Sequence, residues 1–173
     1  PANMLIFLCL ISLPFKSKFF NSRISKTYIV FILLSMSAVI LSFHTLWSDY
    51  NYKSTLKTVI NENSSDSKIQ TLQALVESHP SKSMAHFQLG KSYFYSWTIN
   101  KKVGYLQNSI ESFNKAIALN PQESKFHFRI GVARYFYGMQ LSNLQSIQVS
   151  KEAISDLEKS VRLNKTRALT WYY

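Results

Sequence analysis

The sequence contains very little glycine, proline or cysteine. Of its 173 residues, four are glycine, four are proline and one is cysteine. Because glycine and proline interrupt helices and build tight turns, their scarcity favours an all-helical protein. The single cysteine, Cys9, lies in an apolar run and excludes an internal disulfide or cysteine-based metal framework.

Acidic residues are also scarce: there are 9 Asp and Glu against 20 Lys and Arg, which gives a net charge of +11. Such a charge invites a nucleic-acid interpretation. However, four of the basic residues lie within residues 16–26, and the others are dispersed with no run longer than Lys101-Lys102. A nucleic-acid site would need a clustered basic stripe with stacking aromatic residues. We therefore predict that nucleic acid is not a partner.

No catalytic or metal-binding motif is present. The four histidines, His44, His79, His86 and His127, form no pair at metal-ligand spacing. The sequence also has no Gly-x-Ser-x-Gly turn, no glycine-rich phosphate loop and no HExxH motif. We predict that these residues hold no active site, metal or cofactor and are not themselves an enzyme, whatever the activity of a longer protein.

A long apolar run occupies Thr27–Trp47. Its 21 residues contain no Asp, Glu, Lys or Arg. At about 1.5 Å per residue, a helix of this length crosses a hydrocarbon core of about 30 Å. Tyr28 lies near one end and Trp47 at the other, which suits the aromatic belts of a membrane. We predict a transmembrane helix over residues 27–47, with membrane lipid as a partner.

The charges around this run predict its orientation. Four basic residues precede it, namely Lys16, Lys18, Arg23 and Lys26, and the first acidic residue is Asp49. The positive-inside rule places residues 16–26 in the cytoplasm and everything after the run on the outer side. In a bacterium this means the inner membrane with the remainder facing the periplasm, whereas a eukaryotic origin would mean an organelle lumen.

A shorter apolar run, Met4–Phe15, precedes the basic residues. It has 12 residues and is too short to span a membrane alone. Its basic residues follow the apolar stretch instead of preceding it, which is the reverse of a secretory signal. We interpret residues 1–15 as part of a transmembrane helix that begins upstream, and residues 16–26 as a basic cytoplasmic loop.

The rest of the sequence repeats itself. The segment His86–Gly90 returns as His127–Gly131, 41 residues later, and Ser109–Asn120 is echoed by Ala153–Asn164. A period of this size is typical of stacked two-helix units, none of which can bury its apolar face alone. The predicted fold class is therefore all-α: a transmembrane helix followed by an α-solenoid of helix pairs.

These repeats resemble the tetratricopeptide (TPR) family. A repeat that starts at Ser83 places Leu89-Gly90 and Tyr93 at the family's positions 7, 8 and 11. Pro121 fits position 32 only if the turn between the helices carries an insertion, expected within Trp97–Leu106. The resemblance implies repeats at 83–123 and 124–167, a half-repeat with linking helices at 48–82, and the start of another repeat at 168–173.

The second repeat is degenerate. Its insertion is longer, around Met139–Val149, and Arg134 stands where the family has an aromatic residue. His86 and His127 occupy the same repeat position, where a large packing residue is expected. We predict that both histidines belong to the core and have no catalytic role.

The TPR resemblance also implies a partner-binding groove on the first helix of each pair. The family's groove positions correspond to Met84, Phe87, Lys91, Phe94 and Tyr95, followed by Lys125, Phe128, Val132, Tyr135 and Phe136. Of these, we select Phe87, Lys91, Phe94, Tyr95, Phe128, Tyr135 and Phe136 as candidate contact residues. The set is aromatic with lysines beside it and predicts an apolar groove for a protein or peptide partner.

Two functions remain open at this point. The first is a membrane-anchored TPR scaffold that binds a protein partner on the outer face of the membrane. The second follows from a resemblance to the O-antigen ligase and polymerase family, in which some members end with a spanning helix followed by periplasmic TPR repeats. That resemblance implies an accessory region of a glycan transferase whose catalytic residues lie upstream.

Overall fold

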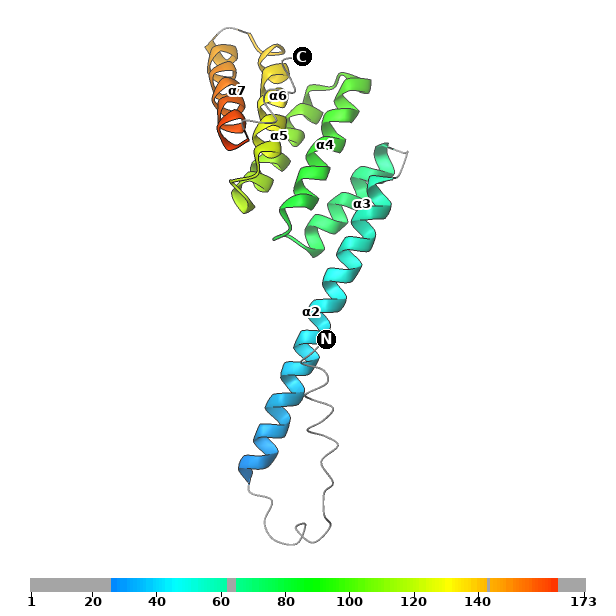
Figure 1. Ribbon diagram of the computed structural model, residues 1–173. Helices are drawn as coiled ribbons and strands as arrows, with labels where there is room; N and C mark the ends of the chain where they lie inside the picture. Colours follow the sequence, from blue (N-terminus) through cyan, green and yellow to red (C-terminus); the bar gives the residue numbers. More distant parts are fainter. Residues whose placement is uncertain (1–25, 62–64, 143, 165–173) are drawn as a thin grey trace, which may run out of the picture. The chain divides into compact units, whose positions relative to one another are not determined.

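The computed structural model describes residues 26–61, 65–142 and 144–164, and all regular structure in them is helical (Figure 1). The helices are α2 (Lys26–Ile60), α3 (Ser65–Ser78), α4 (Ser83–Asn100), α5 (Val103–Leu119), α6 (Ser124–Gly138) and α7 (Leu144–Leu163). The predicted all-α fold is confirmed. The predicted partial span at 1–15, nearly all of the basic loop at 16–26, and the repeat start at 168–173 lie outside the described residues.

The chain divides into two compact units, residues 1–48 and residues 49–173. The described part of the first unit is residues 26–48, which belong to α2. By length and composition, α2 is able to cross a membrane. Its apolar side chains are exposed: Phe31 by 72%, Phe43 by 66% and Leu46 by 71%. The predicted span at 27–47 therefore lies within a single, uninterrupted helix.

The polar side chains in this part of α2 are satisfied by the helix itself. The hydroxyl of Ser35 donates to the carbonyl oxygen of Ile32 at 2.8 Å, and that of Ser42 donates to Ala38 at 2.8 Å. Ser37 and Thr45 bond in the same way, to Leu34 and Ser42. These hydroxyls consequently need no water or external partner.

The second unit begins with the end of α2. Tyr52 and Val59, exposed by 7% and 2%, belong to one buried cluster with Leu72 and Leu75 of α3 and Leu89 of α4. The region 48–82, where the sequence predicts linking helices and a half-repeat, thus contains the last part of α2 and the whole of α3. The helix continues past Trp47 because no glycine or proline occurs between Phe15 and His79.

In the next pair, α4 and α5 approach closely at Gly90. A Cβ placed there would lie 2.7 Å from two ring carbons of Phe113. The hydroxyl of Ser109 donates to the carbonyl oxygen of Gly90 at 2.8 Å, entirely within the core. The pair α6 and α7 has the same arrangement, since a Cβ on Gly131 would lie 2.8 Å from Leu157. Glycine is required at both positions because any side chain would separate the helices.

The two predicted insertions lengthen helices and do not form long loops. The helix α4 continues to Asn100, and Lys101 turns the chain with a φ of 57° while its N–H bonds to the carbonyl of Trp97 at 2.8 Å. The helix α5 begins at Val103, so Lys101 and Lys102 alone form the turn. The second insertion gives α7 its 20 residues.

The repeated histidines link each pair to the preceding one. His86 and His127 are exposed by 5% and 2%, so both belong to the core as predicted. In each, the Nε2–H donates to the carbonyl oxygen of the proline six residues earlier, Pro80 or Pro121, at 2.9 Å. The same bond therefore anchors the start of α4 and the start of α6.

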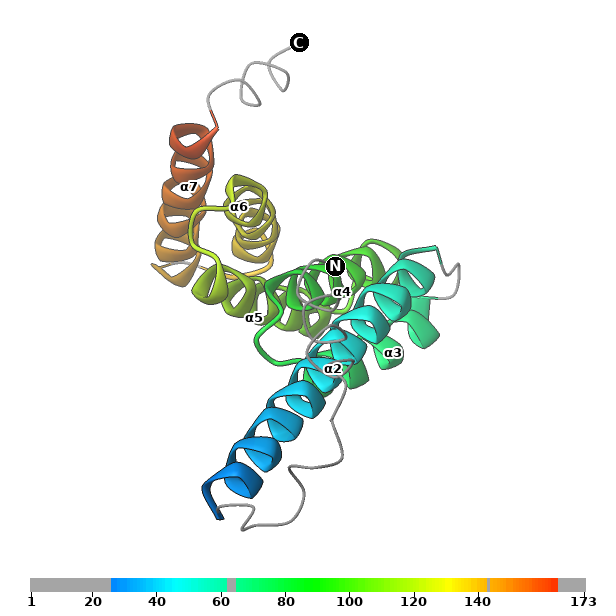
Figure 2. The ribbon, with the colours of Figure 1, turned by 60° about the horizontal axis from the view of Figure 1, so that its bottom comes forward.

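Arg134, on α6, forms ion pairs with acidic residues of α7. Its guanidinium binds the carboxylate of Asp156 and lies 3.4 Å from an oxygen of Glu152. Arg134, which departs from the TPR pattern, thus forms an ion pair between the two helices of its own pair. Contacts run from α3 to α4, α4 to α5, α5 to α6 and α6 to α7, so neighbouring helices in sequence are neighbours in space (Figure 2).

We expect Gly90→Ala to destabilise the second unit by about 1–3 kcal/mol, because the new methyl group overlaps the ring of Phe113. Gly104→Ala is the matched control. A Cβ at Gly104 meets nothing within 4 Å, so it should be neutral or stabilise by up to about 1 kcal/mol. Chemical denaturation of the detergent-solubilised protein, followed by helical circular dichroism, measures both. Equal midpoints for the two variants would contradict the close approach.

Candidate partner-binding face on helices α4 and α6

The helices α4 and α6 are the first helices of successive pairs and contact one another directly. Near their N-terminal ends, the rings of Phe87 and Phe126 lie 4.7 Å apart, measured between centroids. Near their C-terminal ends, Phe136 lies 5.9 Å from Phe94 and 5.0 Å from Trp97. The two helices therefore run side by side in the same direction, with aromatic contacts at both ends.

Phe87 is a core residue and not a groove residue as the sequence predicted. It is exposed by only 5%, and it packs between Phe126 and Phe113, whose ring centroid is 5.7 Å away. Phe87 occupies the repeat position that the sequence assigned to it, but its ring is large enough to reach the interface with the α6–α7 pair. Phe87 consequently forms the floor of the face, and a partner would meet the residues around it.

Two of the predicted residues, Phe94 and Phe136, join an aromatic cluster that also includes Trp97. The rings of Phe94 and Trp97 lie 5.4 Å apart, and Tyr135 adds an edge contact with Phe136 at 5.4 Å. Trp97 is buried, with 6% exposed, and it was missed because the predicted insertion began at that residue. The extension of α4 brings it into the cluster.

The remaining candidates are more exposed. Tyr95 and Tyr135 are exposed by 58% and 50%. Phe128 is half-buried, and the guanidinium carbon of Arg129 lies 5.9 Å from its ring centroid. A single aromatic side chain exposed to water is common on protein surfaces. Tyr135, however, lies beside the cluster of Phe94, Trp97 and Phe136 and extends the apolar surface of that cluster.

Positive charge gathers over the ring of Phe87. The ammonium nitrogen of Lys91, on α4, lies 5.9 Å from its centroid, and that of Lys125, on α6, lies 5.8 Å from the same centroid. Burial around its ammonium group lowers the pKa of Lys91, and the positive charges of Arg129 and Lys68 lower that pKa further. Two positive charges, those of Arg129 and Lys68, therefore act on Lys91.

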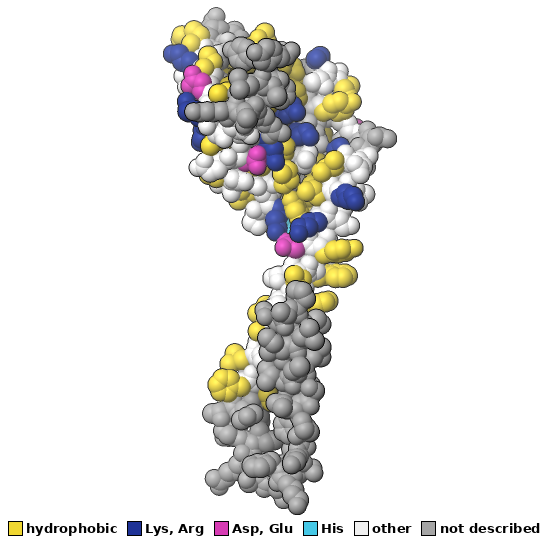
Figure 3. Space-filling model, viewed as in Figure 1, with side chains coloured by type: hydrophobic (Ala, Val, Ile, Leu, Met, Phe, Trp, Pro, Cys, Tyr) yellow, Lys and Arg dark blue, Asp and Glu magenta, His cyan; other side chains and the backbone are white. Residues whose placement is uncertain are grey.

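Acidic residues near this face are few. Glu123 lies 3.5 Å from the ammonium of Lys125. On the face shown in Figure 3, Lys and Arg side chains are spread over the helix pairs among hydrophobic ones, and acidic side chains are sparse. In the described part of the chain, no three His, Cys, Asp or Glu side chains gather as they would around a metal ion.

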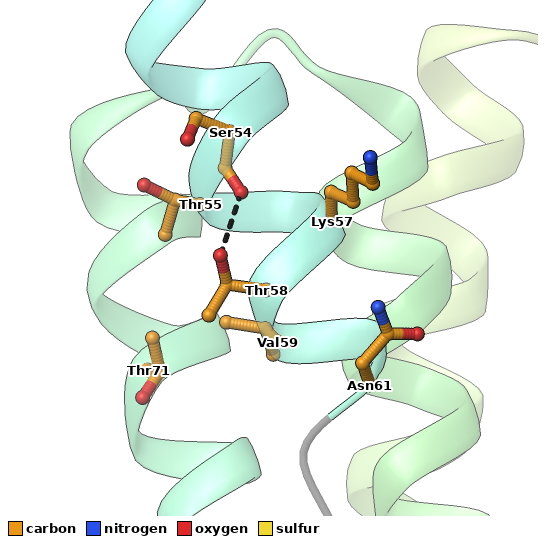
Figure 4. A pocket seen from close by; sticks show the side chains of 7 residues that line it. All are labelled: Ser54, Thr55, Lys57, Thr58, Val59, Asn61 and Thr71. Atoms are coloured by element: carbon orange, nitrogen blue, oxygen red, sulfur yellow. Dashed lines mark hydrogen bonds between the residues drawn. The ribbon is translucent and has the colours of Figure 1, made fainter.

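A separate hollow lies between the end of α2 and α3 (Figure 4). It is lined by Ser54, Thr55, Lys57, Thr58, Val59, Asn61 and Thr71. The hydroxyls of Thr58 and Thr71 donate to backbone carbonyl groups of their own helices at 3.0 Å. The lining offers no cluster of titratable groups, so this hollow adds nothing to the face on α4 and α6.

Comparison with solved structures finds the same fold in MamA, a TPR-repeat protein. A structure of a point mutant of MamA matches 66% of this chain and 73% of its own, with 20% identity and a TM-score of 0.50. A second structure, "MamA MSR-1 C2", matches 70% of this chain and 55% of its own at 19% identity and a TM-score of 0.44. No protein-family model and no curated protein matches the chain. The predicted TPR-like fold is confirmed, and at this identity the likeness concerns the fold alone.

We expect Phe136→Ala to destabilise the helix pairs by about 2–3 kcal/mol, because its ring bridges α4 and α6. Tyr135→Ala, at the neighbouring and half-exposed position, should change the free energy of unfolding by no more than about 0.5 kcal/mol. Denaturation midpoints of both variants provide the comparison. A larger effect for Tyr135→Ala would show that Tyr135 belongs to the core.

Proposed function

We propose that this protein is a membrane-anchored scaffold whose TPR-like helix pairs bind a segment of a protein partner on the face formed by α4 and α6. The observation that carries this proposal is the composition of that face. It combines the half-exposed Tyr135, an aromatic cluster beneath it and the cations Lys91 and Arg129. Aromatic residues with adjacent arginine or lysine are the side chains that protein interfaces favour.

The anchor is supported by the surface of α2. Its large apolar side chains are exposed in an unbroken series, including Leu34, Ile40 and Leu41 at 60%, 63% and 66%. Proteins in water seldom leave so large an apolar surface uncovered. The hydroxyls of this segment bond back to the helix, as a lipid environment demands, because lipid offers them no partner.

We further propose that the anchor lies in a bacterial inner membrane and that the helix pairs face the periplasm. The support is the charge distribution: Lys16, Lys18, Arg23 and Lys26 precede the apolar run, and Asp49 is the first acidic residue. The positive-inside rule favours the side with the basic residues as cytoplasmic.

The anchor predicts that the protein stays in the membrane pellet after alkaline carbonate extraction. Replacing Ser37 and Ile40, near the centre of the run, with lysine should release it, because each lysine costs about 2.5–3.5 kcal/mol at the centre of a spanning helix. Tyr50→Lys, beyond the end of the run, is the control and should leave the protein in the pellet. Extraction of the unaltered protein by carbonate would refute the anchor.

The orientation predicts which cysteines an impermeant maleimide reaches in intact spheroplasts. In a Cys9→Ser background, Ser142→Cys, in the exposed turn between α6 and α7, should be labelled from outside. Ser17→Cys, in the basic loop, should be labelled only after the membrane is permeabilised. The reverse pattern would place the helix pairs in the cytoplasm.

The second candidate is an accessory region of an O-antigen ligase or polymerase-type glycan transferase. One sequence feature favours it: the apolar run Met4–Phe15 and the basic residues before α2 have the order of two spanning helices joined by a cytoplasmic loop. An immunoblot of membranes with an antibody against residues 83–164 separates the candidates. A band near 20 kDa, the mass of these 173 residues, favours a scaffold with a single anchor, and one several times larger favours a polytopic enzyme.

A further inference from the structure

We propose that this protein binds the phosphate group of an anionic phospholipid between Lys53, on α2, and Lys82, the residue directly before α4. The site lies just beyond the end of the apolar run of α2. This inference rests on the membrane anchor of the proposed function and adds to it, because it names a class of lipid and the residues that recognise that lipid.

One exposed face of α2 changes along its length in the same order as the layers of a membrane. Four side chains spaced by three and four residues lie along this face: Phe43, Leu46, Tyr50 and Lys53. The first three are exposed by 66%, 71% and 66%, and the fourth is exposed as well. The face therefore passes from apolar side chains through an aromatic ring to a cation, which is the order from hydrocarbon to head group.

The position of Lys53 along the helix suits a contact with head groups. It follows Trp47, the last residue of the apolar run, by six residues, which corresponds to about 9 Å of helix. The head-group layer on each side of the hydrocarbon core is about 5–7 Å thick. Because the stem of a lysine side chain is long and flexible, the ammonium group of Lys53 reaches back into that layer.

The fold brings a second cation to the same place. Lys82 follows Asp49 by 33 positions in the sequence, yet its ammonium nitrogen lies 2.6 Å from Oδ1 of Asp49 and 5.5 Å from the ring centroid of Tyr52. The hydrogen bond and the charge of Lys82 lower the pKa of Asp49, and the charge of Lys53 lowers that pKa further. Both lysines therefore act on one carboxylate, from two different segments of the chain.

This cluster keeps an excess of positive charge. Lys53 and Lys82 carry two positive charges, and Asp49 neutralises one of them. Among the described residues, no ion pair joins Lys53 to an acid. The side chains of Lys82 and Asp49 are exposed by 37% and 52%, so an incoming phosphate oxygen has access to the ammonium group of Lys82. A phosphate there would gain charge-assisted hydrogen bonds from both lysines.

The neighbouring surface favours a lipid over a free anion. Inorganic phosphate would use the two lysines and leave the exposed side chains of Phe43 and Leu46 without a contact. The acyl chains of a phospholipid would cover those side chains while its phosphate binds the lysines. A lipid with a net negative charge is favoured over a zwitterionic one, because the choline of phosphatidylcholine already neutralises the phosphate of its own head group.

Native mass spectrometry of the full chain in detergent tests the site. The protein is mixed with equimolar phosphatidylglycerol and phosphatidylcholine, and the lipids that stay bound are counted. Each lysine near a membrane surface favours an anionic lipid by a factor of about five, and Asp49 cancels one of the two lysines. We therefore expect a preference of about fivefold for phosphatidylglycerol, which an excess of glycerol phosphate, the head group without acyl chains, does not remove.

Charge variants assign the preference to the site. Lys53→Gln and Lys82→Gln should each reduce it to less than about twofold, and Lys151→Gln, at an exposed position on α7, should leave it unchanged. Asp49→Asn should raise the preference above about tenfold, because it removes the carboxylate that competes with the phosphate. Asp66→Asn, exposed at the start of α3, makes the same change in net charge and should have no effect. Circular dichroism verifies that each variant keeps its helix content.

The outcomes separate the lipid site from the anchor. Release of the unaltered protein by alkaline carbonate would refute both. If the protein stays in the membrane pellet but retains the two lipids equally, the anchor stands and the lipid site is refuted. Displacement of phosphatidylglycerol by glycerol phosphate would show a site for a free phosphate and overturn the inference. An equal loss of preference in Lys151→Gln and Lys53→Gln would also overturn it, because net charge alone would then explain the preference.

Discussion

The close approach of two helices at a glycine is the constraint on which the rest of this array depends. At Gly90 the ring of Phe113 occupies the space of a side chain, and at Gly131 Leu157 does the same. Because α5 lies this close to α4, apolar side chains of α5 also contact the first helix of the next pair, α6. The cluster that joins Phe87, Phe113 and Phe126 is the result.

A hydrogen bond from a histidine to a proline carbonyl group recurs in successive pairs and joins each pair to the preceding one in the same way. His86 and His127 each bind the carbonyl group of a proline that follows the preceding helix, at the same distance of 2.9 Å. Identical anchors start α4 and α6 in the same way, so the two helices lie in parallel register. That arrangement brings Phe136 of α6 to Phe94 and Trp97 of α4, with ring centroids 5.9 Å and 5.0 Å apart.

The long helix α2 has two parts with different surfaces. Its first part exposes large apolar side chains and holds its serine and threonine hydroxyl groups in hydrogen bonds with its own backbone. Its last part, from Asp49 onward, contributes Tyr52 and Val59 to a buried cluster with α3. The absence of glycine and proline from Phe15 to His79 lets both parts share one helix.

The sequence by itself determined the helical class, the repeat period, the apolar run of α2 and the burial of His86 and His127, because these depend on local composition and spacing. The tertiary structure decided where the rings lie. Phe87 is buried beneath the face formed by α4 and α6, Trp97 belongs to the aromatic cluster, and Arg134 pairs with Asp156. A repeat position specifies the direction of a side chain from its own helix. Its burial depends on the next pair, which reaches it through contacts between residues far apart in the sequence, such as that between Phe87 and Phe126.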